Sequence, residues 1–352
     1  MKAAQARTKR LLIRCGAAVG IAAALLTAGC AERLRLFEAR LYAMGTWVDI
    51  AVFSSEDTAA RLFEEAEAFL RRFEVDYYAW ADGELARINR ELAARGEATA
   101  EPAMAALLRE ARRLTIASEG AFDPAVGALV EQWGFHSAFA EPAPPPPEAL
   151  DAWRRSGASL AAVEIDGVVL RTTLPGLKLD LGAIAKGAAV DRLVELAGRH
   201  GIRDALVNAG GDLRVLGRHR GRPWRIGIKD PRADGVLGVV ELEDGEAAFT
   251  SGDYERFVDR GGRRLHHILD PRTGLPVEAT RAVTVIAQSG VVADAAATAL
   301  FVAGDDWHRI ARQVGAEAAL RVDAEGEIEA TESMRRRLVS ASKDEWDVIA
   351  ES

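Results

Sequence analysis

Cysteine is nearly absent from this sequence, which has only two, Cys15 and Cys30, among 352 residues. Cys15 lies in an N-terminal segment that is typical of a secretory signal, so removal of that segment would leave Cys30 alone. A secreted protein without a second cysteine cannot depend on disulfide bonds. The 323 residues that would remain are enough to bury an ordinary apolar core, and we expect that core to hold the fold.

The N-terminal apolar segment, residues 15–30, is too short to cross a bilayer as a helix. It follows five basic residues and ends in small ones, which predicts a signal peptide over residues 1–29. Its last five residues, LTAGC, match every position of a bacterial lipobox and predict that Cys30 is lipidated. An ordinary signal peptide with a chance cysteine at its cleavage site is the alternative. Ala31 follows the cysteine, so the aspartate that signals retention in the inner membrane is missing.

Positive charge is also scarce, because the formal net charge at pH 7 is −8. The predicted signal holds five basic and no acidic side chains, so its removal would take the net charge to about −13. This sign argues against nucleic acid as a partner. A polyanionic ligand such as a dinucleotide would need local positive groups or a bound cation to offset the overall field.

Hydrophobic periodicity predicts an α+β fold with antiparallel or mixed sheets and packed helices, in a single domain. We expect a tether over residues 30–40, the domain over 41–340 and a C-terminal tail over 341–352. Predicted helices cover residues 58–74, 101–120, 184–198 and 291–302, with another after the turn at 121–124. Predicted strands lie within residues 45–53, 163–172, 203–217, 223–231, 238–245, 263–270 and 281–288. The run PAPPPP, residues 142–147, predicts a polyproline surface loop, and no solenoid repeat is present.

The stretch KLDLGAIAKGAAVD, residues 178–191, resembles a phosphate-binding loop but has the wrong order. In a Walker-type loop the lysine follows the second glycine and a hydroxyl residue follows the lysine. Here Lys186 precedes Gly187, and Ala188 occupies the place of the hydroxyl. Any phosphate chemistry of this segment therefore needs groups from elsewhere in the chain.

Glycine- and acid-rich clusters recur at the predicted strand ends. They are LDLGAIAKG (179–187), VNAGGD (207–212), TSGDYE (250–255) with HHILDPRTGLP (266–276), and ADAAATALF (293–301). Each alone is explained by turn chemistry or a local helix cap. Together they indicate a functional site.

Asp294 and Thr298 lie four residues apart in a strongly helical run, so their side chains share one face of the helix. Magnesium prefers oxygen ligands, and one carboxylate, one hydroxyl and a loop carbonyl would suit it. The spacing alone favours the other interpretation, in which Asp294 caps its own helix and Thr298 bonds back to a carbonyl.

His266 and His267 point to opposite faces if their segment is a strand, so only one of them can face a given site. The unperturbed pKa of histidine lies near neutral, which suits proton transfer. An exposed histidine pair on an edge strand is the alternative.

Taken in order, the clusters resemble the ApbE family, the FAD:protein FMN transferases. The resemblance is carried by eight motifs that span nearly all of the chain after the signal: AMGTWVDIAVF, AFDPAVGALVEQWGF, LDLGAIAKGAAVD, VNAGGDLRVLG, IGIKDP, TSGDYERF, HHILDPRTGLP and VADAAATALFVAG. Many family members read DLGGIAKG where this chain reads DLGAIAKG. The lipobox fits as well, since many members resemble lipoproteins.

The resemblance implies a magnesium-dependent transfer of FMN from FAD to a threonine hydroxyl of a target protein, with release of AMP. The implied FAD contacts are Met44, Trp80, Ala121, Phe122, Asp123, Asp180 and Lys186. The implied Mg²⁺ ligands are the carbonyl of Ala183 and the side chains of Asp294 and Thr298, which replaces the helix-cap interpretation. His267 matches the histidine of the family's H-I-x-D-P-x-T-G motif and is the implied acid–base residue.

The resemblance also implies a place and a partner. We expect the protein to be lipid-anchored through Cys30 on the periplasmic face of the bacterial cell envelope, at the inner membrane, although the lipobox does not fix which membrane. The implied acceptor is a flavoprotein subunit of a redox membrane complex. Hydrolysis of FAD to FMN and AMP, or flavin binding without turnover, are the alternatives to transfer.

Overall fold

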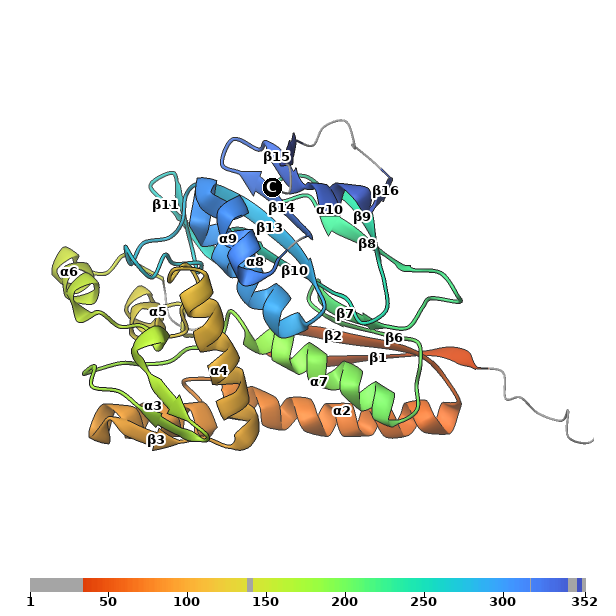
Figure 1. Ribbon diagram of the computed structural model, residues 1–352, viewed down its shortest axis with the longest axis horizontal. Helices are drawn as coiled ribbons and strands as arrows, with labels where there is room; N and C mark the ends of the chain where they lie inside the picture. The colour runs from red at the N-terminus through yellow and green to blue at the C-terminus, as the bar shows by residue number, and fades with distance from the viewer. Residues whose placement is uncertain (1–33, 138–141, 317, 341–346, 350–352) are drawn as a thin grey trace, which may run out of the picture.

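The computed structural model describes residues 34–137, 142–316, 318–340 and 347–349. Its centre is a nine-stranded sheet (Figure 1). In spatial order the strands are β1 (Arg35–Ala43), β2 (Thr46–Ser54), β6 (Ala205–Ala209), β7 (Asp212–Leu216), β10 (Ala247–Gly252), β13 (Thr280–Ala287), β14 (Ala318–Asp323), β15 (Ile328–Thr331) and β17 (Asp347–Ile349). Neighbouring strands are antiparallel except β15 and β17, which are parallel. The mixed sheet confirms the predicted α+β class.

Helices cover one face of this sheet in the order of the strands. Helix α2 (Glu56–Tyr77) packs on β1 and β2, α7 (Ala185–Arg199) on β6 and β7, and α8 (Gly290–Ala303) on β10 and β13, with α9 (Trp307–Val314) beside α8. Figure 1 shows α8, α7 and α2 following one another along the sheet. Their apolar stripes and the inward residues of the strands form the main core.

The opposite face carries a second apolar core under a smaller sheet. This three-stranded sheet contains β16 (Leu338–Ser340), β9 (Val236–Leu242) and β8 (Trp224–Lys229), and α10 (Glu332–Arg336) lies next to it. Residues on either side of each central strand therefore belong to different cores, because successive side chains of a strand point to opposite faces.

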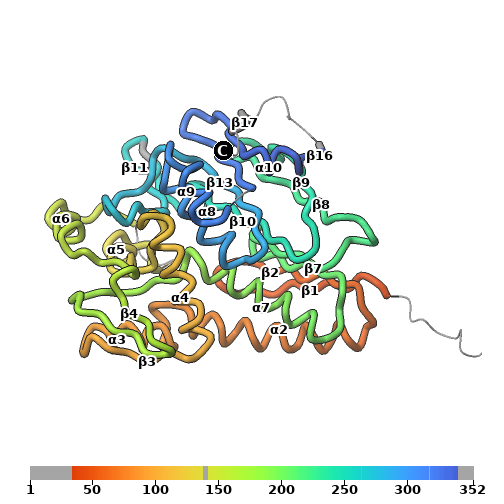
Figure 2. The backbone as a smooth tube through the Cα atoms, viewed as in Figure 1, coloured from red at the N-terminus to blue at the C-terminus, as the bar shows by residue number. Residues whose placement is uncertain are grey.

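A third group of elements lies at the end of the sheet shown on the left in Figures 1 and 2. It holds the helices α3 (Glu84–Arg95), α4 (Pro102–Ala117), α5 (Gly127–Trp133) and α6 (Pro147–Ser156), and the small sheet of β3 (Glu97–Thr99), β5 (Val169–Arg171) and β4 (Glu164–Asp166). The hairpin of β11 (Phe257–Arg260) and β12 (Arg263–His266) lies nearby. Short 3-10 turns cover Leu160–Ala162 and Gly304–Asp306.

Three predicted boundaries are wrong. Strand β1 begins at Arg35, inside the expected tether, because it forms a hairpin with β2 through the left-handed turn residues Met44 (φ 54°) and Gly45 (φ 73°). Strand β17 lies inside the expected tail and pairs with β15. Pro147, the last residue of the expected polyproline loop, begins α6, because proline suits the first turn of a helix.

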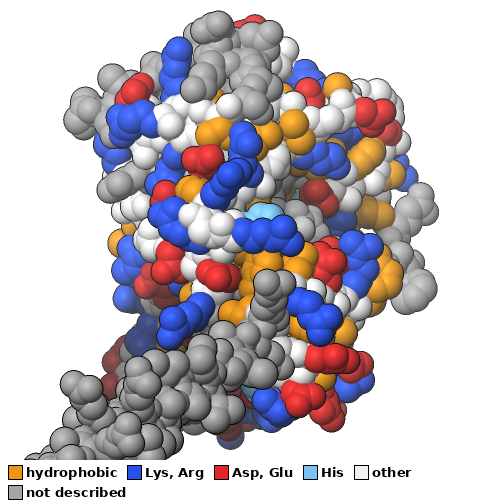
Figure 3. All heavy atoms as spheres, turned by 90° about the vertical axis from the view of Figure 1, so that its right-hand side faces the viewer, with side chains coloured by type: hydrophobic (Ala, Val, Ile, Leu, Met, Phe, Trp, Pro, Cys, Tyr) orange, Lys and Arg blue, Asp and Glu red, His pale blue; other side chains and the backbone are white. Residues whose placement is uncertain are grey.

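Cys30 and the predicted signal lie outside the described residues. Among the helices that are described, none is both long and apolar enough to cross a bilayer. On the face drawn in Figure 3, basic and acidic side chains are interspersed, with no continuous basic surface among the described residues.

Candidate functional site

The sequence clusters meet where β6 turns into β7 and β10 ends. Asp212 opens β7 directly after the turn at Gly210 and Gly211, and Gly252 closes β10. Helix α8 packs across β10, and α7 lies between α8 and the β6–β7 hairpin. Residues separated by more than a hundred positions in the sequence thus share one end of the central sheet.

Lys186, at the start of α7, pairs with Asp212. The other oxygen of the Asp212 carboxylate accepts the backbone N–H of Thr250 at 2.8 Å. Burial alone would lower the pKa of Lys186, but the charges of Asp212 and Asp294 outweigh it and raise the pKa. Lys186 therefore stays cationic. Asp212 belonged to the VNAGGD cluster, and sequence reasoning assigned it only to a turn.

Asp294 lies one turn into α8, with its side chain buried. Its Oδ2 accepts the backbone N–H of Gly187 at 2.8 Å, whereas Ser289 caps α8 itself. Burial raises the pKa of Asp294 to about 7; the carboxylate of Asp212 adds to the rise and Lys186 opposes it. The helix-cap interpretation is therefore wrong for α8. Asp294 binds the first turn of α7 instead, and a carboxylate with this single backbone donor keeps lone pairs for a cation.

Two further oxygens are candidate metal ligands: the hydroxyl of Thr298, one turn beyond Asp294 in α8, and the carbonyl of Ala183, just before α7. The hydroxyl of Thr298 lies 3.2 Å from the hydroxyl of Ser251. Because the N–H of Gly187 donates to Asp294, the carbonyl of Ala183 lacks the donor that a continuing helix would supply. A carbonyl, a hydroxyl and a carboxylate form a hard oxygen set that fits Mg²⁺. The described residues include no group of three His, Cys, Asp or Glu side chains suited to a metal.

The two histidines differ in environment. His266 is buried, and its Nε2 donates to the carbonyl of Val277 at 2.6 Å while its Nδ1 accepts the N–H of Ile268 at 3.3 Å. His267 is half-buried, and its Nδ1 lies 3.2 Å from the carbonyl of Arg256. Since a carbonyl only accepts, Nδ1 of His267 carries the proton and Nε2 keeps a free lone pair. Burial, with the charge of Arg256, lowers the pKa of His267 to about 3, so its imidazole is neutral.

Trp80 and Tyr78 lie beside Lys178, the first residue of the segment 178–191. The Nζ of Lys178 lies 5.2 Å from the centre of the Trp80 ring, and the ring of Tyr78 meets Trp80 edge-on with ring centroids 5.5 Å apart. The indole Nε1 of Trp80 is buried without a partner among the described residues. Burial raises the pKa of Asp180, which accepts the N–H of Gly182 at 2.9 Å. An aromatic face with an unpaired donor suits a flavin ring.

The remaining predicted FAD contacts lie deeper. The side chains of Ala121 and Phe122 are buried in the main core, so only their backbone can face a ligand. The carboxylate of Asp123 accepts the N–H groups of Ala125 and Leu160, both at 2.9 Å, and burial raises its pKa. The N–H of Met44 donates to Glu74 at 3.0 Å. In the structure these residues make packing and turn contacts, and their contact with FAD stays a prediction.

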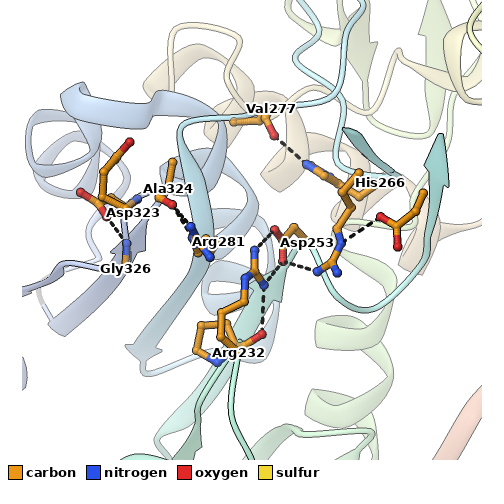
Figure 4. A network of polar contacts seen from close by, with 12 residues as sticks. Arg232, Asp253, His266, Val277, Arg281, Asp323, Ala324 and Gly326 are labelled. Atoms are coloured by element: carbon orange, nitrogen blue, oxygen red, sulfur yellow. Dashed lines mark hydrogen bonds and ion pairs between the residues drawn. The ribbon is translucent and has the colours of Figure 1, made fainter. Parts of the chain in front are cut away.

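A salt-bridge network lies next to strand β12, which ends at His266 (Figure 4). Arg232, between β8 and β9, binds the buried carboxylate of Asp253 through both terminal nitrogens, and the contact from Nη1 measures 2.8 Å. Asp253 also lies 3.6 Å from Nη1 of Arg264, in the strand that leads to His266. The network therefore joins TSGDYE to the HHILDPRTG segment, a contact that neither motif predicts alone.

A cavity of about 560 Å³ lies elsewhere, against Trp133, Leu265, Val277 and Asp305. None of Lys186, His267 or Asp294 lines it. We locate the site by the convergence of its charged and polar groups, because cavity size alone carries no chemistry.

Comparisons with known proteins identify the family of this chain. The model of the ApbE family matches residues 44–320. An FAD:protein FMN transferase of Rhodobacter capsulatus is 45% identical over 309 residues, which cover 84% of this chain and 57% of that protein. One from Vibrio cholerae is 33% identical over 82% of this chain and 87% of its own length.

Solved structures share the fold over their whole length. The crystal structure of the ApbE protein from Thermotoga maritima has a TM-score of 0.80 and 33% identity, and covers 87% of this chain and 100% of its own. The apo form of the flavinyl transferase ApbE from Pseudomonas stutzeri has a TM-score of 0.77 and 31% identity, with 89% and 100% coverage. The chain therefore belongs to the ApbE family of FAD:protein FMN transferases.

Proposed function

We propose that this chain transfers the FMN half of FAD to a threonine hydroxyl of an acceptor protein in a magnesium-dependent reaction. The acceptor oxygen attacks the phosphorus on the FMN side of the diphosphate, and the bond from that phosphorus to the bridging oxygen breaks. The products are a phosphoester of the acceptor and AMP. The observation that carries the proposal is the contact between the start of α7 and α8: Lys186 pairs with Asp212 near the charge of Asp294, and Asp294 binds the N–H of Gly187.

The residues have separate tasks in this mechanism. Ala183, Asp294 and Thr298 would hold Mg²⁺, which when bound offsets diphosphate charge during in-line displacement. Lys186 adds a permanent positive charge, held in place by Asp212. Trp80 and Asp180 would position the flavin nucleotide. Because the protein is net negative, this local positive charge is needed to hold a diphosphate.

His267 would accept the proton of the attacking hydroxyl through its free Nε2. Its neutral state suits a base, but a pKa of about 3 makes it a weak one in the free protein. A diphosphate bound nearby would raise that pKa, because a neighbouring anion stabilises the imidazolium. The base would therefore become competent only when FAD is in place.

Purified protein mixed with FAD, Mg²⁺ and a threonine-bearing peptide tests this function. Flavin bound covalently to the peptide supports transfer. Free FMN without peptide modification would assign hydrolysis instead, and intact FAD would assign binding without turnover. The same peptide with valine in place of threonine is the matched control.

We further propose that Cys30 is lipidated, that the protein works at the periplasmic face of the inner membrane, and that its acceptor is a flavoprotein subunit of a redox membrane complex. The lipobox sequence supports the anchor. Cys30→Ala should move the full-length protein from the membrane fraction to the soluble periplasmic fraction. Retention of this variant in the membrane would contradict lipid anchoring at Cys30.

A further inference from the structure

The carboxylate of Asp191 ties three elements together. On one side, its Oδ1 accepts the N–H of Gly290 at 2.7 Å and its Oδ2 accepts the N–H of Val291 at 3.1 Å, both in the first turn of α8. The hydroxyl of Ser289 donates to Oδ2 at 2.9 Å. On the other side, Nη1 of Arg214, in β7, donates to Oδ1 at 2.9 Å. Asp191 itself belongs to α7, so one side chain fixes α7, β7 and the start of α8.

The contact between α7 and α8 is reciprocal. Gly187 and Asp191 are one turn apart on α7, and Gly290 and Asp294 are one turn apart on α8. The N–H of Gly187 donates to Asp294, and the N–H of Gly290 donates to Asp191. Each helix thus supplies the carboxylate that satisfies orphan N–H groups in the first turn of the other.

At Gly187 and Gly290 the backbones of the two helices approach each other closely. A Cβ added to Gly187 would lie 2.3 Å from the carbonyl oxygen of Gly290, and one added to Gly290 would lie 2.8 Å from that of Gly187. At such a close approach, a small rotation of α8 moves Asp294 relative to Ala183. The bonds of Asp191 oppose that rotation.

The two aspartates differ in how fully they are satisfied. Both oxygens of Asp191 are occupied by the four donors above. Asp294 has the single backbone donor Gly187 and the charge of Lys186 nearby. Arg214 is held in turn, because it also donates to the carbonyls of Gly245 at 3.0 Å and Gln288 at 3.1 Å. Asp191 is therefore suited to hold the helices, and Asp294 to bind.

We propose that Asp191 is the positioning residue of the metal site: it touches neither metal nor flavin, and it sets the distance between the Ala183 carbonyl and the Asp294 carboxylate. The inference rests on the proposed function, because it presumes that these two groups bind a divalent cation. Groups behind the ligands of a metal site commonly change its affinity about 10- to 100-fold when they are replaced.

Binding of Mn²⁺, counted by the loss of the free-ion EPR signal in the presence of FAD, measures the effect directly and without turnover. In Asp191→Asn, we expect the dissociation constant of Mn²⁺ to rise about tenfold or more. The matched control is Asp323→Asn, because Asp323 also accepts three backbone N–H groups, from Glu325, Gly326 and Glu327 at 2.8–2.9 Å, in a turn between β14 and β15. The control should bind Mn²⁺ within about twofold of the unmodified protein.

The variant Asp294→Ala distinguishes a wrong assignment of the metal site from a wrong positioning role for Asp191. If the unmodified protein and Asp294→Ala bind Mn²⁺ alike, the metal site itself is wrongly assigned. If Asp294→Ala loses binding but Asp191→Asn retains full affinity, only the positioning role is overturned. Circular dichroism and the melting temperature report whether each variant is folded. Should Asp191→Asn fail to fold, Arg214→Met is the deciding variant, since it removes one donor to Asp191 and keeps the three in the α8 region; unchanged Mn²⁺ affinity in it would overturn the proposal.

Discussion

Two adjacent histidines have opposite surroundings, and the difference is set by which ring nitrogen meets a carbonyl. His266 donates from Nε2 to Val277 and accepts at Nδ1, so both of its nitrogens are occupied. His267 donates from Nδ1 to Arg256, and Nε2 remains available. Only His267 therefore has a free lone pair for proton transfer.

The tautomers and charge states of these histidines can be measured separately. Long-range ¹H–¹⁵N spectra of ¹⁵N-histidine-labelled protein should show the Nε2–H tautomer for His266 and the Nδ1–H tautomer for His267. Because burial lowers both pKa values, that of His267 to about 3, the His267 ring should stay neutral as the pH falls from 8 to 5. The variants His266→Gln and His267→Gln assign the signals. A His267 signal that titrates near 6.5 would contradict the geometry.

Replacement of Asp294 and of His267 should fail in different ways. Asp294→Ala should abolish Mg²⁺-dependent transfer, because it removes the only carboxylate among the proposed ligands. His267→Gln should slow transfer about 10²- to 10⁴-fold and leave the dissociation constant of FAD nearly unchanged, since a base acts on the hydroxyl and not on flavin binding. Single-turnover rates and FAD titrations measure both. An unchanged rate in Asp294→Ala at limiting Mg²⁺, or collapsed FAD binding in His267→Gln, would contradict these roles.

At the scale of elements, the crossing of α7 and α8 depends on glycine. Gly187→Ala should destabilise the protein by about 1–3 kcal/mol, because its Cβ would meet the backbone of Gly290 at 2.3 Å and force the helices apart. Gly198→Ala, in the same helix, is the control: a Cβ there meets nothing within 4 Å, so it should stabilise by about 0.5–1 kcal/mol. Urea unfolding measures both free energies. Equal effects of the two substitutions would mean that the close approach carries no strain.

The sequence predicted the elements with strong periodicity and missed those without it. Helices α2, α7 and α8 matched their expected ranges within a few residues, α2 and α7 because each has an apolar stripe, and α8 because its run is rich in alanine and apolar nearly all round. Strand β1 was assigned to a tether, since its outward positions are charged or exposed and only its pairing with β2 makes it a strand. The contact of Asp294 with α7 could not be predicted either, because a local spacing rule sees only the helix that carries the residue.

At the scale of the whole molecule, the central sheet separates two faces: the helices on one face carry the proposed metal ligands, and the other face carries the second apolar core. The main core under α2, α7 and α8 adjoins every proposed metal ligand, whereas the second core lies under the β16–β9–β8 sheet. The sequence pattern predicted a mixed sheet. It did not predict the strand order β2-β6-β7-β10-β13, which brings Asp212, Ser251 and Asp294 together. The family resemblance, and not the local pattern, predicted that Ala183, Asp294 and Thr298 meet, and it assigned no role to Asp212 or Ser251.

Core substitutions on the two faces of the sheet should have different effects on the Mg²⁺ dependence of transfer. Leu300, in α8, and Leu242, in β9, are both fully buried, so replacing either with alanine should lower the free energy of unfolding by about 2–5 kcal/mol. Only Leu300→Ala should also raise the Mg²⁺ concentration needed for half-maximal transfer, because Leu300 lies in the helix that carries Asp294 and Thr298. Urea unfolding and Mg²⁺ dependence, measured on the same preparations, compare the two. If Leu242→Ala shifts the Mg²⁺ dependence equally, the sheet transmits packing changes between its faces and does not insulate the site from them.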